Sequence, residues 1–398
     1  MNKLWISNGK LVTDNGKIIE GNNCPCVSGC EYFASGYGIS WEGGYGHIYT
    51  FVFVSETGEW TEWLLERYKK RYPADVDLEH LPPLYKTIQE AVIPYLSSYS
   101  PTRFYVANGR YVTNPRTASK NSIFYFEGES NTDTVLITMG RVGWYANDFW
   151  DNFNISNNYQ DGDYPEDMSD YDKAFTSYVF EAGLCINCNI HVEVVGHASH
   201  SFYSGYRDGG HIGIAGAYCC TIYAKAGNGV APSVGGSWPS GGGIGISNAF
   251  GCDITALTGN GDSWSPEGYP DNEKPLYGAR GGSFNMSGAS NTVNIITGKS
   301  TDGLDVSAAC NGADVTISKP ADYYWFTKKP LRKNIGFVST SNGGNWTYDY
   351  EEDGGRGGNF YSYELYNSDI VVSLGSGGIN VHFSGHQGAD GQRIPIDY

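Results

Sequence analysis

The chain has 398 residues and a formal net charge of −17, which argues against nucleic acid as a ligand because phosphate binding requires a basic surface. It contains 54 glycines, 31 tyrosines and only 17% charged residues. This composition favours turns and strands over helices and predicts an all-β protein.

Two kinds of targeting segment are absent from the sequence. No stretch approaches the ~20 consecutive apolar residues of a membrane-spanning helix, so we expect no membrane insertion. The first nine residues, MNKLWISNG, lack the apolar core of a signal peptide. The composition is nevertheless typical of proteins that act outside a cell. A virion component released by lysis would reconcile the two observations, and an extracellular or cell-surface protein exported by another route is the alternative.

Residues 1–45 predict a small β-meander followed by a cysteine cluster. Short β-rich runs at 4–6, 11–13 and 18–19 are separated by Asn-Gly pairs, the strongest short hairpin signal. Cys24, Cys26 and Cys30 supply three thiols, whereas a structural zinc site needs four ligands, so local packing or inter-chain cross-linking is favoured over metal. The meander with Cys-Pro-Cys resembles the starts of tail or fibre proteins of gut bacteriophages, which implies an attachment segment.

Residues 46–100 predict a helical cap region. Apolar and aromatic residues at helical spacing predict one amphipathic helix over about 57–72, and a second runs from about Pro83 to Tyr95. A strand, an Asn-Gly turn and another strand follow at 103–112. This order resembles the entry segment of the pectin-lyase-like superfamily, which implies a right-handed parallel β-helix whose open end is covered by a helix.

A repeat within residues 101–320 supports the same fold. Cys185, Ala217 and Ala249 lie 32 residues apart, and apolar positions two residues apart surround each of them, as strands require. A fourth copy places Phe284 and Met286 on a first strand and Val293 and Ile295 on a second. In a fifth expected copy, Leu304 and Val306 form the first strand and Val315 and Ile317 the second. An earlier coil is expected with Phe124 and Phe126 followed by Val135 and Ile137, and a late coil with Ile370 and Val372 followed by Ile379 and Val381. Residues 321–398 are expected to form a capping or oligomerisation section.

One inward column of the repeat consists of Cys188, Cys220 and Cys252. Stacked coils would bring neighbouring Cα atoms near disulfide distance, yet three thiols cannot all pair. A small buried cysteine packs well as a hydrophobic residue. We therefore favour a ladder of packed thiols, with a disulfide or a metal or reactive role as the alternatives.

An acidic segment contains Asp161, Asp163 and Asp167 among six carboxylates. Oxygen-rich loops suit Ca²⁺, but Pro165 occupies the third ligand position that an EF-hand loop would need. A solvated acidic loop is the favoured interpretation. A calcium ion is the alternative, and we expect no other cofactor.

The candidate residues for glycan chemistry lie in the loops between the strand pairs and at one outward strand position. Cleavage of a glycan requires paired carboxylates, or a carboxylate with a basic partner, on the outward face of adjacent coils. The candidates are Asp208 and Asp262 in loops and Asp253 at an outward strand position equivalent to Thr221 and Asn189, but no column of acids repeats and no basic partner lines up with them. Aromatic side chains suit stacking on sugar rings or protein contacts, and they equally suit pinning of glycine-rich loops. The aromatic candidates for ligand binding are Tyr203, Tyr206, Trp238, Trp264 and Tyr269.

These features together predict a structural or receptor-binding component of a phage tail fibre or tailspike. The resemblance implies a homotrimer that contacts other virion tail proteins and a glycan of the host surface. Two alternatives stay open at this stage. One is a polysaccharide-degrading β-helix enzyme, a hydrolase or lyase of the tailspike depolymerase kind, and the other is a bacterial surface adhesin.

Overall fold

A computed structural model describes most of the chain. The described residues are 4–7, 10–13, 18–19, 50–71, 79–96, 102–113, 124–142, 148–160, 162–164, 179–195, 209–230, 240–262, 278–303, 311–319, 332–345, 353–381 and 386–396. Near the N-terminus, strands β1 (Leu4–Ser7), β2 (Lys10–Thr13) and β3 (Ile18–Ile19) form the predicted antiparallel meander.

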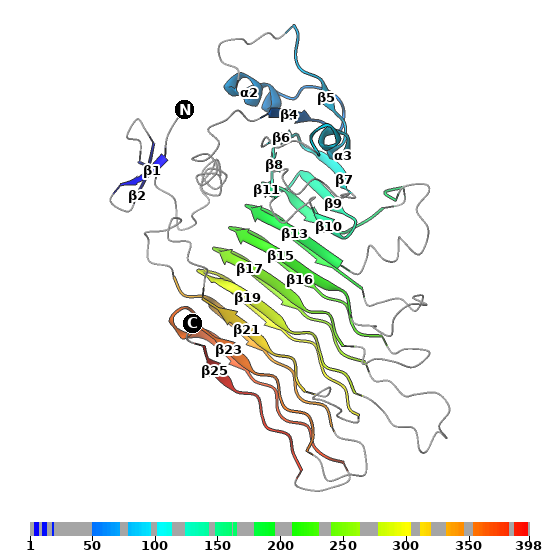
Figure 1. The fold of residues 1–398 in the computed structure, drawn as a ribbon, viewed down its shortest axis with the longest axis vertical. Helices are drawn as coiled ribbons and strands as arrows, with labels where there is room; N and C mark the ends of the chain where they lie inside the picture. The colour runs from blue at the N-terminus through cyan, green and yellow to red at the C-terminus, as the bar shows by residue number, and fades with distance from the viewer. Residues whose placement is uncertain are drawn as a thin grey trace.

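The rest of the described chain winds between two parallel sheets (Figure 1). We call them the long sheet and the short sheet. The long sheet has the order β25 (Arg393–Pro395), β23 (Phe360–Ser362), β21 (Val315–Ser318), β19 (Phe284–Ala289), β17 (Ile244–Phe250), β15 (His211–Tyr218), β13 (Val179–Ile186), β11 (Phe149–Asp151), β8 (Phe124–Gly128), β6 (Thr102–Val106), β4 (Thr50–Val54) and β5 (Leu84–Tyr85), with β10 (Arg141–Val142) paired to β13. The short sheet has the order β24 (Asp369–Ser373), β22 (Ile335–Ser339), β20 (Thr292–Ile296), β18 (Asp253–Leu257), β16 (Thr221–Lys225), β14 (Asn189–Glu193), β12 (Asn154–Ser156), β9 (Thr134–Thr138) and β7 (Gly109–Thr113).

This alternation defines a parallel β-helix and confirms the predicted fold class. Successive coils keep the 32-residue register, because Cys185 pairs with Ala217 and Ala217 with Ala249. Residues at alternate positions point inward and stack into one continuous core. Near the N-terminal end the core is aromatic, and the rings of Phe126 and Trp150 stack at 4.1 Å between centroids.

The structure corrects three of the expected coils. In the earlier coil, Leu136 stacks inward between Tyr111 and Ile155, so Val135 and Ile137 point outward and not, as expected, into the core. Val315 and Ile317 pair with Phe284 and Met286 in the long sheet, so they form a first strand and not the predicted second strand. The late coil is also wrong, because Ile370 lies on β24 of the short sheet, and Ile379 and Val381 are exposed. Strands of both sheets have the same alternating apolar pattern, so the pattern alone could not identify the sheet. Parallel pairing continues through β22 to β25, within the section predicted to cap or oligomerise.

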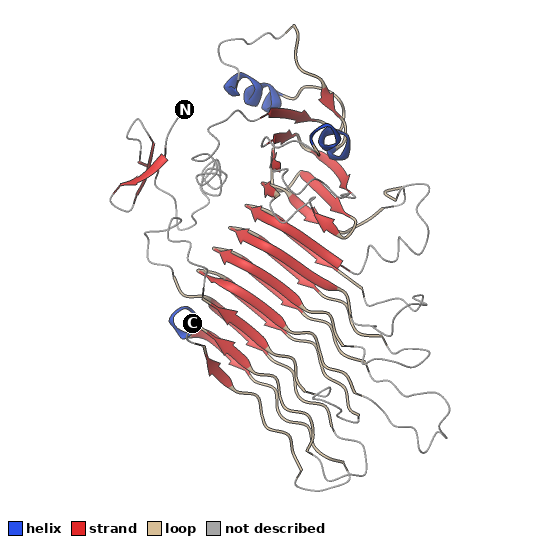
Figure 2. Cartoon of the chain, in the orientation of Figure 1, coloured by secondary structure: helices blue, strands red, loops and turns tan. Residues whose placement is uncertain are grey.

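Short helices accompany the first coils (Figure 2). Helix α3 (Ile88–Val92) begins after Thr87, whose hydroxyl accepts a hydrogen bond from Glu90 N–H, and its apolar residues join the main core. It continues as the 3-10 helix η1 (Ile93–Tyr95). Helix α2 (Glu62–Arg71) packs Leu64 and Tyr68 against the outer side of the long sheet. Within the described residues, a further short helix near the C-terminus is α5 (Glu364–Asn367). Both predicted N-terminal helices therefore exist, except that residues 84–85 form β5. No helix in the described part of the chain is long and apolar enough to cross a membrane.

Glycine-rich segments connect the short sheet to the next strand of the long sheet, and segments of neighbouring coils pack against one another there. Backbone hydrogen bonds of 2.8–3.0 Å link Gly227 to Gly210, Gly242 to Gly227 and Gly259 to Gly242. A Cβ atom on Gly242 would lie only 1.9 Å from the carbonyl oxygen of Gly210. Glycine is therefore required here by the close approach of neighbouring backbones. We call this region the glycine end.

The predicted cysteine ladder is present inside the solenoid. Cys188, Cys220 and Cys252 are buried and carry free thiols, as does Cys185. The thiol of Cys220 donates to the carbonyl oxygen of Cys185 at 3.4 Å. Burial raises the pKa of the Cys188 and Cys252 thiols well above the ordinary value, so both stay protonated. These contacts fit packed thiols and not a disulfide among the three.

Candidate functional site

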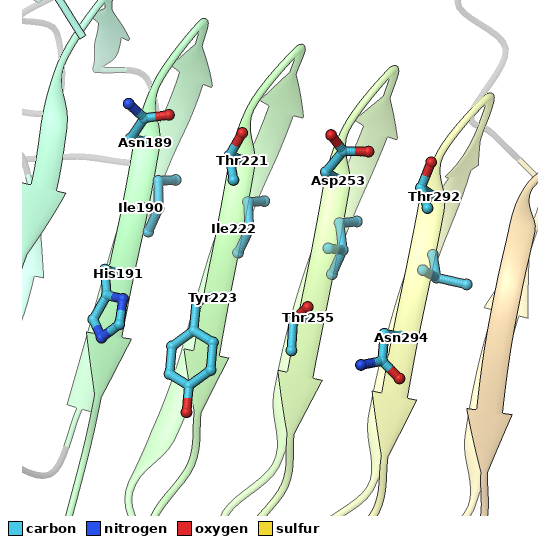
Figure 3. Close-up of a pocket in the computed structure, with 12 residues that line it drawn as sticks. Asn189, Ile190, His191, Thr221, Ile222, Tyr223, Asp253, Thr255, Thr292 and Asn294 are labelled. Carbon is cyan, nitrogen blue, oxygen red and sulfur yellow. The ribbon is translucent and has the colours of Figure 1, made fainter. Parts of the chain in front are cut away.

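A shallow groove of about 350 Å³ lies on the outer face of the short sheet, across β14, β16, β18 and β20 (Figure 3). Two columns of outward side chains line it. The first column is Asn189, Thr221, Asp253 and Thr292, and the second is His191, Tyr223, Thr255 and Asn294.

The alternation of the strands produces these columns. Ile190 and Ile222 are almost completely buried, so the residues on either side of each point outward. Parallel pairing in register then aligns Asn189 with Thr221 and His191 with Tyr223. The repeat therefore produces the groove. Its outward positions carry polar and aromatic side chains, whereas the inward positions of the same strands carry aliphatic ones.

The most distinctive contact in the groove joins two rings. The imidazole of His191 stacks on the phenol ring of Tyr223 with centroids 4.6 Å apart and an angle of 16° between the planes. At the ends of the same two strands, Lys225 and Glu193 form an ion pair at 2.8 Å, half exposed on both sides and therefore of little energetic weight. The stacked rings give the groove a flat surface with polar edges, on which a sugar ring could pack.

Asp253 is the one carboxylate among the described residues that line the groove. Asp262, the second described candidate acid, lies beyond the end of β18, and the strand alone spans about 13 Å. Glycosidases hold their two carboxylates about 5 to 9.5 Å apart. The structure therefore does not bring Asp253 and Asp262 into one catalytic pair, and Asp208 lies outside the described residues.

The predicted aromatic ligand-binding residues also lie outside the described residues. Tyr203, Tyr206, Trp238, Trp264 and Tyr269 fall in segments 196–208, 231–239 and 263–277. The described residues that flank these segments belong to the glycine end, where Gly209 bonds Ser240 and Gly241 bonds Arg280 through the backbone. The described residues on both sides of each segment thus lie at the glycine end.

The acidic segment is described only in part, since Asp161 and Asp167 lie outside the described residues. Asp163 forms an ion pair with Arg110, which occupies one of its oxygens. Among the described residues, no group of three or more His, Cys, Asp or Glu side chains is arranged to hold a metal ion. The calcium site stays a prediction.

Sequence reasoning singled out Asp253 but did not join His191 with Tyr223. The signal was present, because His191, Tyr223 and Thr255 follow one another at the 32-residue step. Each lies two residues after a member of the column Asn189, Thr221 and Asp253, which the repeat predicts to point outward, so these residues were predicted to point outward as well.

Comparisons with known proteins add no identification. No protein-family model matches the chain, and neither the curated proteins nor the solved structures contain a match.

Proposed function

We propose that this chain binds an extended glycan along the groove on the short sheet, as a receptor-binding component of a phage tail fibre or spike. The observation that carries the proposal is the stack of the exposed His191 ring on the part-exposed Tyr223 ring, beside columns of hydroxyl, amide and carboxylate groups. Sugars present both apolar ring faces and hydroxyl groups, and this surface offers partners for both.

The repeat suits a polymer better than a single sugar. Neighbouring strands lie ~4.8 Å apart, so a chain lying across β14 to β20 would meet a polar group at each step. Thr221, Asp253 and Thr292 provide such groups in the first column. The capped, rigid solenoid holds them in place before the ligand arrives, which lowers the entropic cost of binding.

The virion setting rests on the resemblance of the N-terminal meander and its Cys-Pro-Cys to phage tail proteins. In that setting the partners are other tail proteins, the assembly is a homotrimer and the ligand belongs to the host surface. Static light scattering tests the trimer, and a monomer would overturn it. Neighbouring genes for capsid, portal or baseplate proteins would separate a virion protein from a bacterial surface adhesin, which could use the same groove.

A depolymerase is the second candidate, favoured only by Asp253 in the groove. Incubation of the purified protein with a polysaccharide that it binds, followed by chromatography of the products, tests this activity. Shortened chains that disappear in Asp253→Asn would establish the enzyme. Binding with no change in chain length supports the receptor-binding role.

Binding to surface polysaccharides of candidate host bacteria tests the groove directly. We expect Tyr223→Ala and His191→Ala to weaken binding about tenfold or more, since each removes one ring of the stack. Tyr363→Ala is the matched control, because Tyr363 is a part-exposed tyrosine just before helix α5 and lies neither in the groove nor on the strands of the short sheet. Equal binding by the wild type and both groove variants would overturn the proposal.

A further inference from the structure

A second hollow, of about 400 Å³, lies on the outer face of the long sheet, where β15, β17 and β19 begin. It is separate from the groove, which belongs to the short sheet. The residues that matter for its chemistry are His211, Gly243, Gly245, Arg280, Ser283 and Asn285.

One glycine at the base, or floor, of this hollow, Gly245, is not required by close contact with neighbouring atoms. Gly245 lies inside β17, where glycine weakens a strand, and a Cβ atom added there would meet nothing within 4 Å. Its neighbour in register, Gly213, has only one atom near the 4 Å limit. Gly242, by contrast, faces a backbone oxygen at 1.9 Å. A strand glycine with free space above it leaves room for a ligand to approach the sheet.

Positive charge exceeds negative charge beside the hollow, where Arg280, which lines it, meets Arg356 and Asp314, which lie behind it. Arg280 and Arg356 both donate to the single carboxylate of Asp314, which also accepts from Asn359 N–H at 2.7 Å. Burial acts to raise the pKa of Asp314, but these hydrogen bonds and charges outweigh it and lower the pKa, so the carboxylate stays ionised. Two guanidinium groups against one carboxylate leave a net charge of about +1 beside the hollow.

Hydrogen-bond donors complete the surface. The Nδ1 atom of His211 accepts from Gly243 N–H at 3.1 Å, so a neutral imidazole carries its proton on Nε2, as a donor. Ser283 and Asn285 add a hydroxyl and an amide. None of the described residues lining the hollow is acidic, and Glu181 stands beyond Gly213 on β13. In a chain with a net charge of −17, this is an unusual local environment.

We infer that the hollow binds the carboxylate of an acidic saccharide, with Arg280 as its charge partner and Gly245 as the open floor. A planar guanidinium suits a carboxylate, and the exposed amide and hydroxyl groups suit sugar hydroxyls. The saccharide part of this inference rests on the proposed function, whereas the anion site follows from the hollow itself. A glycan with uronic acid residues could therefore engage both faces of the solenoid.

Titration of the full chain with glucuronate, glucose 6-sulfate and glucose, followed by ligand-observed NMR or calorimetry, tests the inference. We expect glucuronate to bind more tightly than glucose, and to bind less tightly as salt increases. Arg280→Gln should weaken glucuronate binding about tenfold or more, because it removes a charge-assisted hydrogen bond. Lys225→Gln, which removes one positive charge from the short sheet, is the matched control and should bind normally.

Gly245→Val tests the floor without disturbing the fold, because valine suits a strand and the space above Gly245 is open. We expect this variant to keep the thermal stability of the wild type and to lose glucuronate binding. His211→Asn, which keeps an acceptor for Gly243 N–H but loses the Nε2 donor, should weaken binding as well. Glucuronate that binds no better than glucose, or that binds Gly245→Val normally, would overturn the inference. Binding of glucose 6-sulfate alone would replace the carboxylate assignment. Tyr223→Ala separates the two sites, because it should affect only the groove.

Discussion

The side chain of Asn291 accepts a hydrogen bond from the backbone N–H of Cys252, one coil earlier, at 3.0 Å. Asn291 occupies the position at which Cys252, Cys220 and Cys188 stand in the preceding coils. The same bond recurs one coil later, where Asn334 accepts from Asn291 N–H at 2.9 Å. The cysteine ladder therefore continues as an asparagine ladder. In both, a side chain accepts a hydrogen bond from the backbone N–H of the coil before it, and an amide oxygen is a stronger acceptor than a thiol sulfur.

Asn291→Ala should destabilise the solenoid by about 2–4 kcal/mol, because several buried polar groups lose a partner. The groups are Cys252 N–H, the carbonyl oxygen of Ala249 and Oδ1 of Asn334. Denaturant unfolding measures the change. Asn294→Ala, which removes an exposed asparagine from the next strand, is the control and should have little effect. Equal stability of the two variants would show that the ladder adds nothing.

Cys252→Asn should be tolerated, because the adjacent coil already holds asparagine at this position. The new amide would accept from Cys220 N–H, which now bonds the Cys252 sulfur at 3.4 Å, and would donate to Ala217 in the way that Asn291 donates to Ala249. Replacement of a weak sulfur acceptor by an oxygen should leave the unfolding free energy unchanged or raise it. A loss of more than about 1 kcal/mol would contradict the equivalence of the two ladders.

The sequence predicted the coils and the inward cysteines because apolar residues at period 2 and a 32-residue step record which side chains stack. It failed at Val315, since inward residues of both sheets follow the same pattern and a long connection hides which sheet comes next. It also missed the asparagine ladder. Asparagine in a glycine-rich chain indicates a turn, and only stacking shows that Asn291 and Asn334 are buried and paired.

The candidate site was predictable only in part, for a related reason. The outward direction of Asp253 followed from the repeat, whereas a ring stack depends on two side chains that belong to different coils. The aromatic residues of the loops fall outside the repeat, so no register could assign them to a face. The repeat shows that His191 and Tyr223 are neighbours, but the distance and angle between their rings depend on side-chain rotamers, which spacing does not record.

The unfolding free energy should fall as pH rises above about 9. Burial raises the pKa of Tyr111 to about 12, above its ordinary value of 10.0, and raises the pKa of the Cys188 thiol as well. Each group binds its proton more tightly in the folded chain, so the stabilisation is complete below the unfolded pKa and is lost as pH rises through the folded one. Tyr111 alone should account for a loss of about 2 kcal/mol between about pH 10 and about pH 12.

Denaturant titrations at about pH 8 and about pH 11 check this dependence. In Tyr111→Phe the stability at neutral pH should be lower, because the hydroxyl donates to the carbonyl oxygen of Ala107 at 2.9 Å, but the loss at alkaline pH should be smaller. A variant that loses as much stability as the wild type at high pH would exclude Tyr111 as the responsible group.

Two glycines three residues apart separate the structural role of glycine from its role in the hollow. Gly242→Ala should cost about 2–3 kcal/mol or more, because its Cβ would sit 1.9 Å from the Gly210 oxygen and would force apart backbones joined by hydrogen bonds. Gly245→Ala should leave stability unchanged or raise it by up to about 1 kcal/mol, since alanine restricts the unfolded chain and meets no atom within 4 Å. Thermal and denaturant unfolding of both variants measures the difference. A similar loss in both would mean that β17 itself requires glycine, and the open floor would then need no ligand to explain it.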